Sequence, residues 1–345
     1  MTYWSDVQEQ PQILHALIQT YQQSQVWSQL IADSGLIVLS GMGASYNALY
    51  PAWFYLNQQG RTALHLETST LIHYLPSLLG TCEVMVVVSQ SGESIEIKKL
   101  VEQLETRRRQ DLKTPVLISV TNSAQNTLAN YGDISLPTHA GAEVGIATKT
   151  YTSSMLMLNF VAKALVGQLQ SQDFETGTAI ATLCQDWLDK KTASVEAAFE
   201  AFQAITYMAL IGRGPALATA HNGALIFKEG VRLPAEGYSG GQFRHGPREM
   251  ISADLGLLVL TSPDATLDLN LRLAADILDY GGRLVCIGQP GSPAGVSIAL
   301  PSAIDSLYYP ILEILPIQLL AARLASDRNL EPGVFRWSGK VVDQE

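Results

Sequence analysis

Two halves of this 345-residue chain repeat the same landmarks in the same order. Gly41-Met42-Gly43 is matched 171 positions later by Gly212-Arg213-Gly214, and Leu136-Pro137 is matched 164 positions later by Leu300-Pro301. Around both sets, short runs suited to strands alternate with longer amphipathic runs suited to helices. The recurrence indicates a duplicated domain. Alternating strands and helices imply parallel sheets with helices on both faces, and such sheets bind ligands at the carboxyl ends of their strands.

Each copy is predicted to contain several strands and helices. In the first copy we expect strands over 36–40, 63–67, 84–88, 115–121 and 134–137, with helices over 44–58, 93–109 and 155–168. In the second copy we expect strands over 207–211, 255–261, 283–287 and 297–301, with helices over 216–230 and 267–280. Between the copies, 179–202 contains no Gly or Pro and is predicted to be one long helix.

These elements predict five parts of the chain. We expect an N-terminal helical segment over 1–32, domains over 33–170 and 205–328, a linker helix within 171–204, and a C-terminal tail over 329–345.

Composition excludes several classes of protein. Hydrophobic residues make up 47% of the chain, the net charge is −10 and no long basic run occurs, so a nucleic-acid or anionic-membrane surface is not expected. The N-terminus lacks a signal-peptide pattern and no apolar stretch reaches the length of a membrane span, so a cytoplasmic protein is expected. Cys82, Cys184 and Cys286 fit neither a disulfide framework nor metal-ligand spacing, and we predict reduced, mostly buried thiols.

A hydroxyl-rich turn follows the apolar run 84–88. Ser89, Gln90, Ser91 and Ser94 lie between this predicted strand and a helix that is predicted to start near Glu93. Hydroxyls and free backbone N–H groups at a helix start can hold a phosphate without positive side chains. The alternative is ordinary N-capping by Ser91, but capping needs one such residue rather than four.

The Gly-x-Gly turns are weaker signals. After the first predicted strand, Ser45 could add a hydroxyl and Ala44 its backbone to the phosphate site, although Ser45 could equally be an N-cap. The full dinucleotide fingerprint needs a third glycine that this turn lacks, so no nicotinamide or flavin is expected. The histidines outside the turn 243–247 show no metal-ligand spacing, so no metal is predicted. These residues are His15, His65, His73, His139 and His221. No cofactor of any kind is required.

Several short pieces in this order resemble the SIS (sugar isomerase) domain family. The chain is most similar to the isomerase half of the glucosamine-6-phosphate synthases and their relatives. The pieces are 43–48, 89–94, 140–145, Gly212-Arg213-Gly214, Lys228-Glu229, Arg244-His245-Gly246-Pro247 and Lys340. The resemblance implies an α/β protein with two tandem doubly wound, flavodoxin-like SIS domains. It covers almost the whole chain, but the glutaminase domain of the synthases has no counterpart here and Asn222 replaces a family carboxylate.

The resemblance also implies three catalytic residues. Glu229 would be the base that moves a proton between C1 and C2, unless it is a surface residue paired with Lys228 or Arg232. His245 would open the sugar ring, and in the family it serves the site of a neighbouring subunit, which implies at least a homodimer. Lys340 would polarise the carbonyl or form an imine with the open-chain ketose, which needs a neutral amine.

Further pocket residues are expected after the fourth predicted strand of the first copy. Ile146 and Thr148 are predicted to bind substrate, and Glu143 is a candidate for the sugar pocket. Lys149 could line the pocket or be a solvated surface residue. The matching turn of the second copy, 261–264, lacks the serine motif, so one hydroxyl-type phosphate site per chain is expected.

The resulting prediction is a phosphosugar isomerase that acts on a ketose, aldose or amino-sugar phosphate by ring opening and proton transfer. One alternative is an amino-sugar-phosphate deaminase or a fructosamine-6-phosphate deglycase, which would release an amine from a related intermediate. Another is a sugar-phosphate sensor without catalysis, although binding alone would not need Glu229, His245 and Lys340.

Overall fold

The computed structural model describes residues 2–30, 35–190, 192–289, 295–337, 339–340 and 342. The chain forms two compact units. Unit 1 comprises Met1–Pro11, Val144–Thr148 and Ala179–Phe335, and unit 2 comprises Gln12–Glu143, Lys149–Thr178 and Arg336–Glu345. Residue 33, where the first domain is expected to begin, lies outside the described residues.

Unit 2 is built on a five-stranded sheet in which every neighbouring pair is parallel. Its strand order is β2 (Ala63–Glu67), β1 (Ile37–Gly41), β3 (Val84–Ser89), β4 (Val116–Thr121) and β5 (Ile134–Pro137). All residues of the central strands β1 and β3 are buried, as expected for a sheet covered on both faces.

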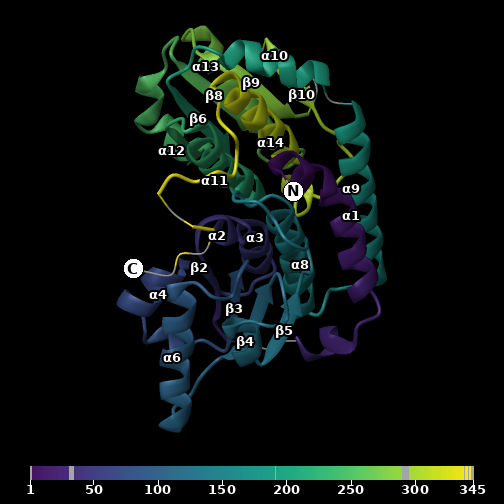
Figure 1. The fold of residues 1–345 in the computed structure, drawn as a ribbon, viewed down its shortest axis with the longest axis vertical. Coiled ribbons are helices and arrows are strands. Elements are labelled where there is room, and N and C mark those ends of the chain that lie inside the picture. Colours follow the sequence, from purple (N-terminus) through teal and green to yellow (C-terminus); the bar gives the residue numbers. More distant parts are fainter. Residues whose placement is uncertain are drawn as a thin grey trace. The chain divides into compact units, whose positions relative to one another are not determined.

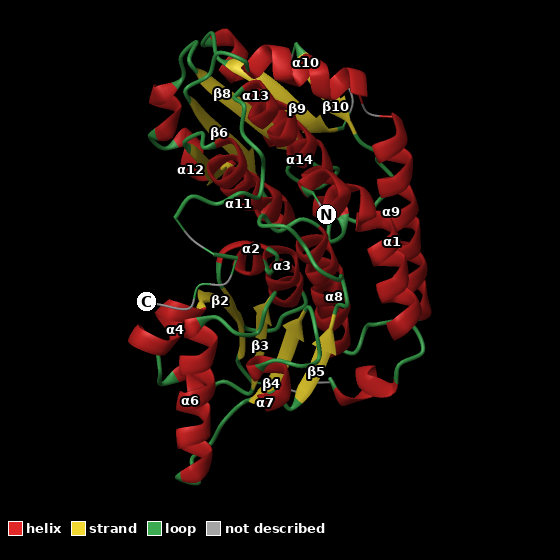
Figure 2. Cartoon of the chain, in the orientation of Figure 1, coloured by secondary structure: helices red, strands yellow, loops and turns green. Residues whose placement is uncertain are grey.

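Helices form a layer on each face of this sheet (Figure 2). One layer shares a buried apolar cluster with the sheet and contains α4 (Thr68–Tyr74), α5 (Leu78–Thr81), α6 (Ile95–Arg109) and α7 (Thr127–Tyr131). On the other side, α3 (Tyr50–Gln58) and α8 (Lys149–Leu165) pack on each other and on β2 and β4. The helices α1 (Tyr3–Tyr21) and α9 (Ser171–Lys190) each contribute residues to both units.

Unit 1 repeats this plan (Figure 1). Its parallel sheet has the order β10 (Val296–Ala299), β9 (Arg283–Gly288), β8 (Leu255–Thr261), β6 (Tyr207–Gly212) and β7 (Ala235–Ser239). One face packs against α12 (Gly240–Arg244) and α13 (Leu267–Asp279). The sheet also contacts α10 (Thr192–Phe202), α11 (Leu217–Ile226) and α14 (Tyr309–Asp327). Two doubly wound α/β sheets are therefore present, as the sequence predicts.

Several element boundaries differ from the prediction. The expected helix over 44–58 is two helices, α2 (Gly43–Asn47) and α3, because Pro51 lacks the N–H that a continuous helix would need there. The expected helix over 179–202 corresponds to α9 up to Lys190 and to α10 from Thr192, with residue 191 outside the described residues. Helix α6 begins at Ile95 rather than at Glu93, and α8 begins six residues earlier than expected. Strand β7 and helix α14 are not among the predicted elements.

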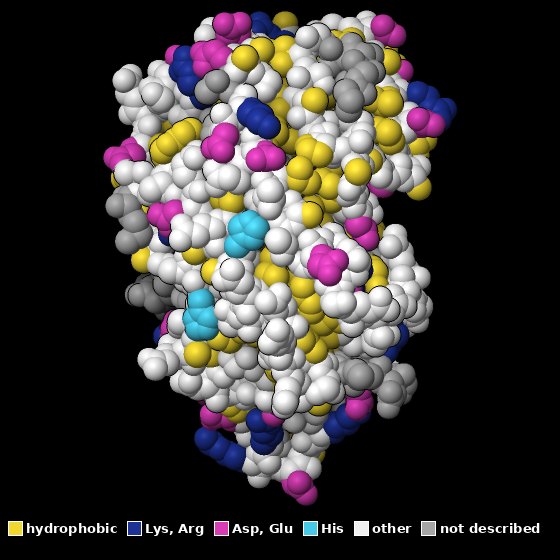
Figure 3. All heavy atoms as spheres, turned by 90° about the vertical axis from the view of Figure 1, so that its right-hand side faces the viewer, with side chains coloured by type: hydrophobic (Ala, Val, Ile, Leu, Met, Phe, Trp, Pro, Cys, Tyr) yellow, Lys and Arg dark blue, Asp and Glu magenta, His cyan; other side chains and the backbone are white. Residues whose placement is uncertain are grey.

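The described surface agrees with the acidic composition. On the face drawn in Figure 3, acidic and basic side chains are interspersed and no extended basic patch appears among the coloured residues. Within the described ranges, no helix combines the length and apolar character needed to cross a bilayer. Cys82, Cys184 and Cys286 are buried free thiols, as predicted.

Candidate active site

The Ser89–Ser94 turn begins where β3 ends. The Gly92 N–H donates to Ser89 Oγ and the Glu93 N–H donates to Ser91 Oγ, both at 3.1 Å. Each serine hydroxyl therefore acts as an acceptor within the turn, and neither donates its own proton to another described residue. Ser94 is the N-cap residue of α6, but its side chain makes no capping hydrogen bond. Ser94, rather than Ser91, therefore occupies the N-cap position of α6.

Contacts with α7 hold this turn in place. Gly92 has φ +66°, and a Cβ at this position would overlap the side chain of Asn126. Asn126 is itself fixed, because its Oδ1 accepts the Ala129 N–H at 2.8 Å. The Thr127 N–H donates to Glu93 at 2.6 Å, and this bond lowers the pKa of Glu93. The hydroxyls are therefore preorganised before any ligand arrives.

The first Gly-x-Gly turn lies at the same end of the sheet, where the carboxyl ends of the strands meet. Strands β1 and β3 are neighbours, with Gly41 in register with Val88. A Cβ on Gly41 would lie 3.1 Å from both the Ser45 carbonyl carbon and the Val88 carbonyl oxygen, so any larger residue here would have to push α2 or β3 back by a few tenths of an ångström. Ala44 and Ser45 are half-buried in α2. The structure thus brings the predicted phosphate residues of unit 2 together at the ends of two adjacent strands.

The C-terminal tail reaches the same unit. The Ile95 N–H, in the first turn of α6, donates to the Val342 carbonyl oxygen at 3.1 Å. Lys340 Nζ lies 3.1 Å from Glu143 Oε2 and donates to the Glu143 carbonyl oxygen at 2.5 Å. The Glu143 side chain is fully buried and also accepts from the Thr150 hydroxyl at 2.6 Å. Lys340 and Val342 are therefore docked on unit 2, and Glu143 is a partner of Lys340 that the sequence did not indicate.

The segment Val144–Thr148 belongs to unit 1. Ile146 is buried, and its Cδ1 lies 2.9 Å from where a Cβ on Gly230 would be, so the predicted substrate residue contacts the neighbour of Glu229. Thr148 is fully buried. Lys149 is only 2% exposed, so the alternative prediction that it is a solvated surface residue is wrong.

Glu229 lies in a π-helical turn, Phe227–Val231, that directly continues α11. Turns of this kind are rare and often occur at functional sites. The turn ends at Arg232, which has the left-handed φ of +56°. Glu229 is half-buried, and desolvation raises its pKa to about 7, with Lys228 acting in the opposite direction. A carboxyl group with this pKa can both accept and return a proton near neutral pH.

Asn222 lies two turns before Glu229 on α11 and is 1% exposed. Both its amide nitrogen and its amide oxygen are buried without a hydrogen-bond partner among the described residues. Such groups are rare in folded proteins, because each costs free energy unless something satisfies it. The amide is therefore available to a bound ligand or water.

His245 ends α12 and is exposed to solvent. It is followed by Gly246 at φ +132° and then by a short 3₁₀ helix, Pro247–Met250. Its backbone N–H donates to the Gln242 carbonyl oxygen at 3.0 Å, which fixes the backbone at this point. His245 and Glu229 belong to unit 1, whereas Lys340 and the Ser89–Ser94 turn belong to unit 2.

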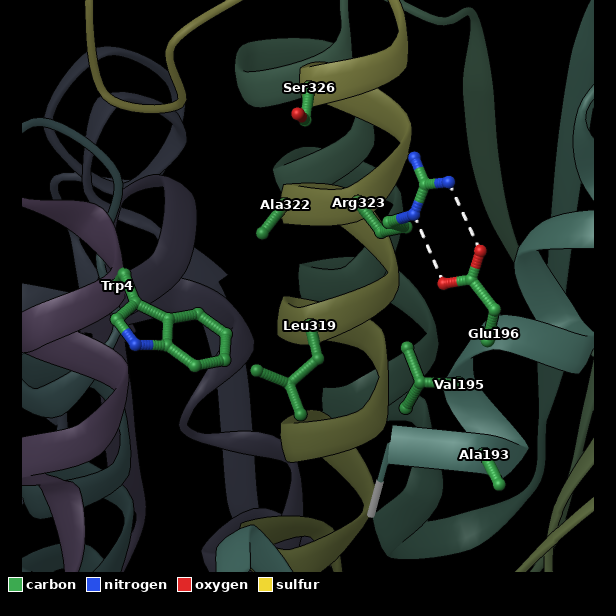
Figure 4. A pocket seen from close by; sticks show the side chains of 8 residues that line it. All are labelled: Trp4, Ala193, Val195, Glu196, Leu319, Ala322, Arg323 and Ser326. Carbon is green, nitrogen blue, oxygen red and sulfur yellow. Dashed lines mark hydrogen bonds and ion pairs between the residues drawn. The ribbon is translucent and has the colours of Figure 1, made fainter.

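A separate pocket of about 580 Å³ lies on unit 1. Figure 4 shows Trp4 and Leu319 beside one another there, and Arg323, which also lines the pocket, is paired to Glu196 through two hydrogen bonds of 3.0 Å. The lining is mostly apolar and includes none of the predicted site residues. Across the described ranges, no group of three or more His, Cys, Asp and Glu side chains is arranged to hold a metal.

The SIS domain model matches residues 30–164 and 206–309, and the chain belongs to this family of proteins. Among curated proteins, it is 27% identical over 352 residues to the glutamine–fructose-6-phosphate aminotransferase (isomerizing) of Pyrobaculum aerophilum. The alignment covers 99% of this chain and 57% of that relative, so the chain spans little more than half the length of the protein it matches.

Solved structures agree with the fold. The tagatose-6-phosphate ketose/aldose isomerase of Escherichia coli superposes with a TM-score of 0.83 at 19% identity, over 98% of this chain and 97% of that one. The glucosamine-6-phosphate deaminase of Thermotoga maritima gives a TM-score of 0.79 at 17% identity, over the full length of both chains. These similarities establish a shared fold and leave the reaction to be argued from the site.

Proposed function

We propose that this protein is a phosphosugar isomerase that opens the ring of a ketose, aldose or amino-sugar phosphate and moves a proton between C1 and C2. The observation that carries the proposal is Glu229, a half-buried carboxyl group whose pKa is raised to about 7 by desolvation. A base with this pKa is largely ionised above neutral pH, yet basic enough to take a proton from a carbon next to a carbonyl. Membership of the SIS domain family supports a phosphosugar as the substrate.

In this proposal the Ser89–Ser94 turn holds the phosphate. Ser89, Ser91 and Ser94 donate their hydroxyl protons, Gln90 adds its amide, and Ala44 and Ser45 contribute from the neighbouring strand end. Support comes from the rigid turn and from the hydroxyl protons that its internal hydrogen bonds leave free. We assign Ile146, Thr148 and Asn222 to the sugar, and the buried Asn222 amide has no hydrogen-bond partner among the described residues.

The chemical steps follow from the residue types. His245 transfers the anomeric hydroxyl proton to the ring oxygen, which breaks the ring C–O bond and gives the open chain. Glu229 then removes the C2 proton of the aldose, the C2 electron pair forms the C1–C2 double bond, and the C1 carbonyl oxygen takes the negative charge. After the oxygens exchange a proton, Glu229 returns its proton to C1 and the C2 ketone forms.

Lys340 serves as the cation beside the developing oxyanion. Its ion pair with the buried Glu143 supports this role over covalent catalysis, because an imine would require the amine to leave that partner. His245 acts in the site of a neighbouring subunit of at least a homodimer, and its exposed position at the end of a short helix is compatible with this arrangement.

A panel of hexose and amino-hexose phosphates tests the proposal. The full chain is incubated with each compound, and sugar isomers and ammonia are both measured. Interconversion of an aldose and a ketose phosphate without ammonia supports the isomerase. Ammonia release from glucosamine 6-phosphate would instead establish the deaminase, amine release from a fructosamine 6-phosphate the deglycase, and tight binding without turnover the sensor.

A further inference from the structure

The second sheet has its own strand-end position for a ligand. In the sheet order β10-β9-β8-β6-β7, the chain passes from β6 to β7 on one side and from β8 to β9 and β10 on the other. The strand order therefore reverses between β6 and β8. Ligands in open α/β sheets bind beyond the carboxyl ends of strands at such a switch point. In the first sheet the equivalent strands are β1 and β3, whose ends carry Ser45 and the Ser89–Ser94 turn. The equivalent ends in unit 1 are those of β6 and β8.

The hydroxyl groups that follow β8, and the N–H group directly before α13, already form hydrogen bonds with other groups of the protein. The Ser262 hydroxyl donates to Glu313, a fully buried carboxyl group on α14. Asp264 Oδ1 accepts from both the N–H and the hydroxyl of Thr266, each at 2.7 Å, directly before α13. A phosphate site like that of the first sheet is therefore closed here, as the missing serine motif suggests.

The end of β6 carries an arginine instead. Arg213 Nε donates to Asn270 Oδ1 at 2.9 Å, and Asn270 is anchored because its Nδ2 donates to the Leu260 carbonyl oxygen at 2.9 Å. A Cβ on Gly240 would lie 2.7 Å from Arg213 Cζ, so the guanidinium packs directly on this glycine. Arg213 Nη2 is buried and has no hydrogen-bond partner among the described residues. The guanidinium is thus fixed in place with donors unused.

Charge and space both favour an anion beside this guanidinium. Desolvation and the positive charge of Arg244 hold the pKa of Arg213 below its usual range, with Asp264 acting in the opposite direction. No carboxylate in the described ranges forms an ion pair with Arg213. A Cβ on Gly241 would have Arg213 Nη1 and Ser239 Oγ at 3.9 Å and no other described atom within 4 Å, so there is space beside Gly241 next to this guanidinium.

We propose that Arg213 and Arg244 form a second anion site on this chain, at the switch point of the unit 1 sheet, that takes a phosphate group. A guanidinium fork matches the geometry of phosphate oxygens, and a second arginine supplies charge for a dianion. The ligand is inorganic phosphate or the phosphate of a small metabolite. The site differs from the Ser89–Ser94 turn in donors and in unit, and it does not depend on the proposed reaction. Because His245 follows Arg244 directly, ligand binding here would also bear on the position of that histidine.

Phosphate binding to the full chain tests this proposal. In a Ser89→Ala/Ser91→Ala variant that disables the first site, inorganic phosphate and glucose 6-phosphate are titrated separately by calorimetry at constant ionic strength. We expect one binding event per chain to remain, and the tighter of the two compounds identifies the source of the phosphate. Loss of all phosphate binding in this variant would overturn the proposal.

Substitutions of Arg213 and Arg244, and of Arg248 as a control, are then added to that background. Arg213→Met and Arg244→Met should each weaken the remaining event at least tenfold, whereas Arg213→Lys should restore only part of the affinity because it lacks the fork. Arg248→Met is the matched control, since it removes an exposed positive charge four residues from Arg244. Arg244 is exposed, so its substitution tests the site even if Arg213→Met impairs folding. Equal affinity in the Arg244→Met and Arg248→Met variants would contradict the proposal.

Discussion

At the scale of single residues, a substitution of Asn222 is expected to change stability and turnover in opposite directions. Replacing Asn222 with Leu removes two buried polar atoms that have no partner among the described residues, at similar volume, so we expect the free energy of unfolding to rise by about 1–3 kcal/mol. The same change should lower turnover, because the ligand would lose its amide partner. Urea unfolding and sugar-phosphate kinetics measure the two effects.

Asn270→Leu is the matched control for this substitution. Asn270 is equally buried in the same unit, but its amide is satisfied by Arg213 and by Leu260. That variant should therefore be destabilised. If Asn222→Leu lost stability as well, the Asn222 amide would have a partner in the protein itself.

Glu313 predicts a pH dependence of stability. Burial raises its pKa to about 7 from an ordinary value of 4.5, although Ser262 and Thr219 donate to it. The folded state therefore binds this proton more tightly than the unfolded state does. The resulting stability is fully present below pH 4.5 and is lost as the pH rises through about 7.

Glu313→Gln removes the ionisable group while keeping a polar partner for Ser262 and Thr219. Above pH 7 this variant should gain up to about 3 kcal/mol relative to wild type, and below pH 4.5 the gain should vanish. Denaturant midpoints measured across this range test the expectation, with the exposed Glu249→Gln as control. Parallel pH profiles for wild type and Glu313→Gln would contradict it.

At the scale of elements, the sequence predicts most strands but only part of the site. Strand β5 occurs at its predicted residues, 134–137, because Ile134 and Leu136 alternate with Ser135 and Pro137 in the period-2 pattern of a half-buried strand. The π-helical turn around Glu229 and the docking of Val342 on Ile95 depend on contacts between residues distant in sequence, so no local pattern reveals them. Strand β7, whose sequence Ala-Glu-Gly-Tyr-Ser is polar and lies at the sheet edge, escapes prediction for a similar reason.

The turn between β3 and α6 gives an element-scale prediction. Gly92→Ala forces an L-residue to φ +66° and drives its Cβ into Asn126, so the free energy of unfolding should fall by at least about 1–3 kcal/mol. Phosphate affinity at the Ser89–Ser94 turn should fall with it. Gly60→Ala, at φ +77° with open space around the Cβ, shows how much of the effect is backbone strain alone. Equal losses in both variants would argue against the Asn126 contact.

At the scale of the whole molecule, the role proposed for His245 predicts complementation between inactive variants. If each site combines Glu229 of one subunit with His245 of another, mixing Glu229→Gln with His245→Ala creates one intact site in every mixed dimer. Unfolding and refolding the mixture should restore about one quarter of wild-type turnover, as random pairing of dimers requires. Activity that stays at the level of the separate variants would place His245 in the site of its own subunit.

The central claim is that Glu229 moves a proton to and from the sugar. The most direct test is to follow, by proton NMR in heavy water, exchange of the C1 and C2 hydrogens of the sugar phosphate that the chain turns over. Wild type should incorporate deuterium at a rate that rises through a pKa of about 7, and Glu229→Gln should slow exchange by about 10²–10⁴-fold. Exchange at an undiminished rate in Glu229→Gln, with Glu249→Gln as reference, would contradict the account.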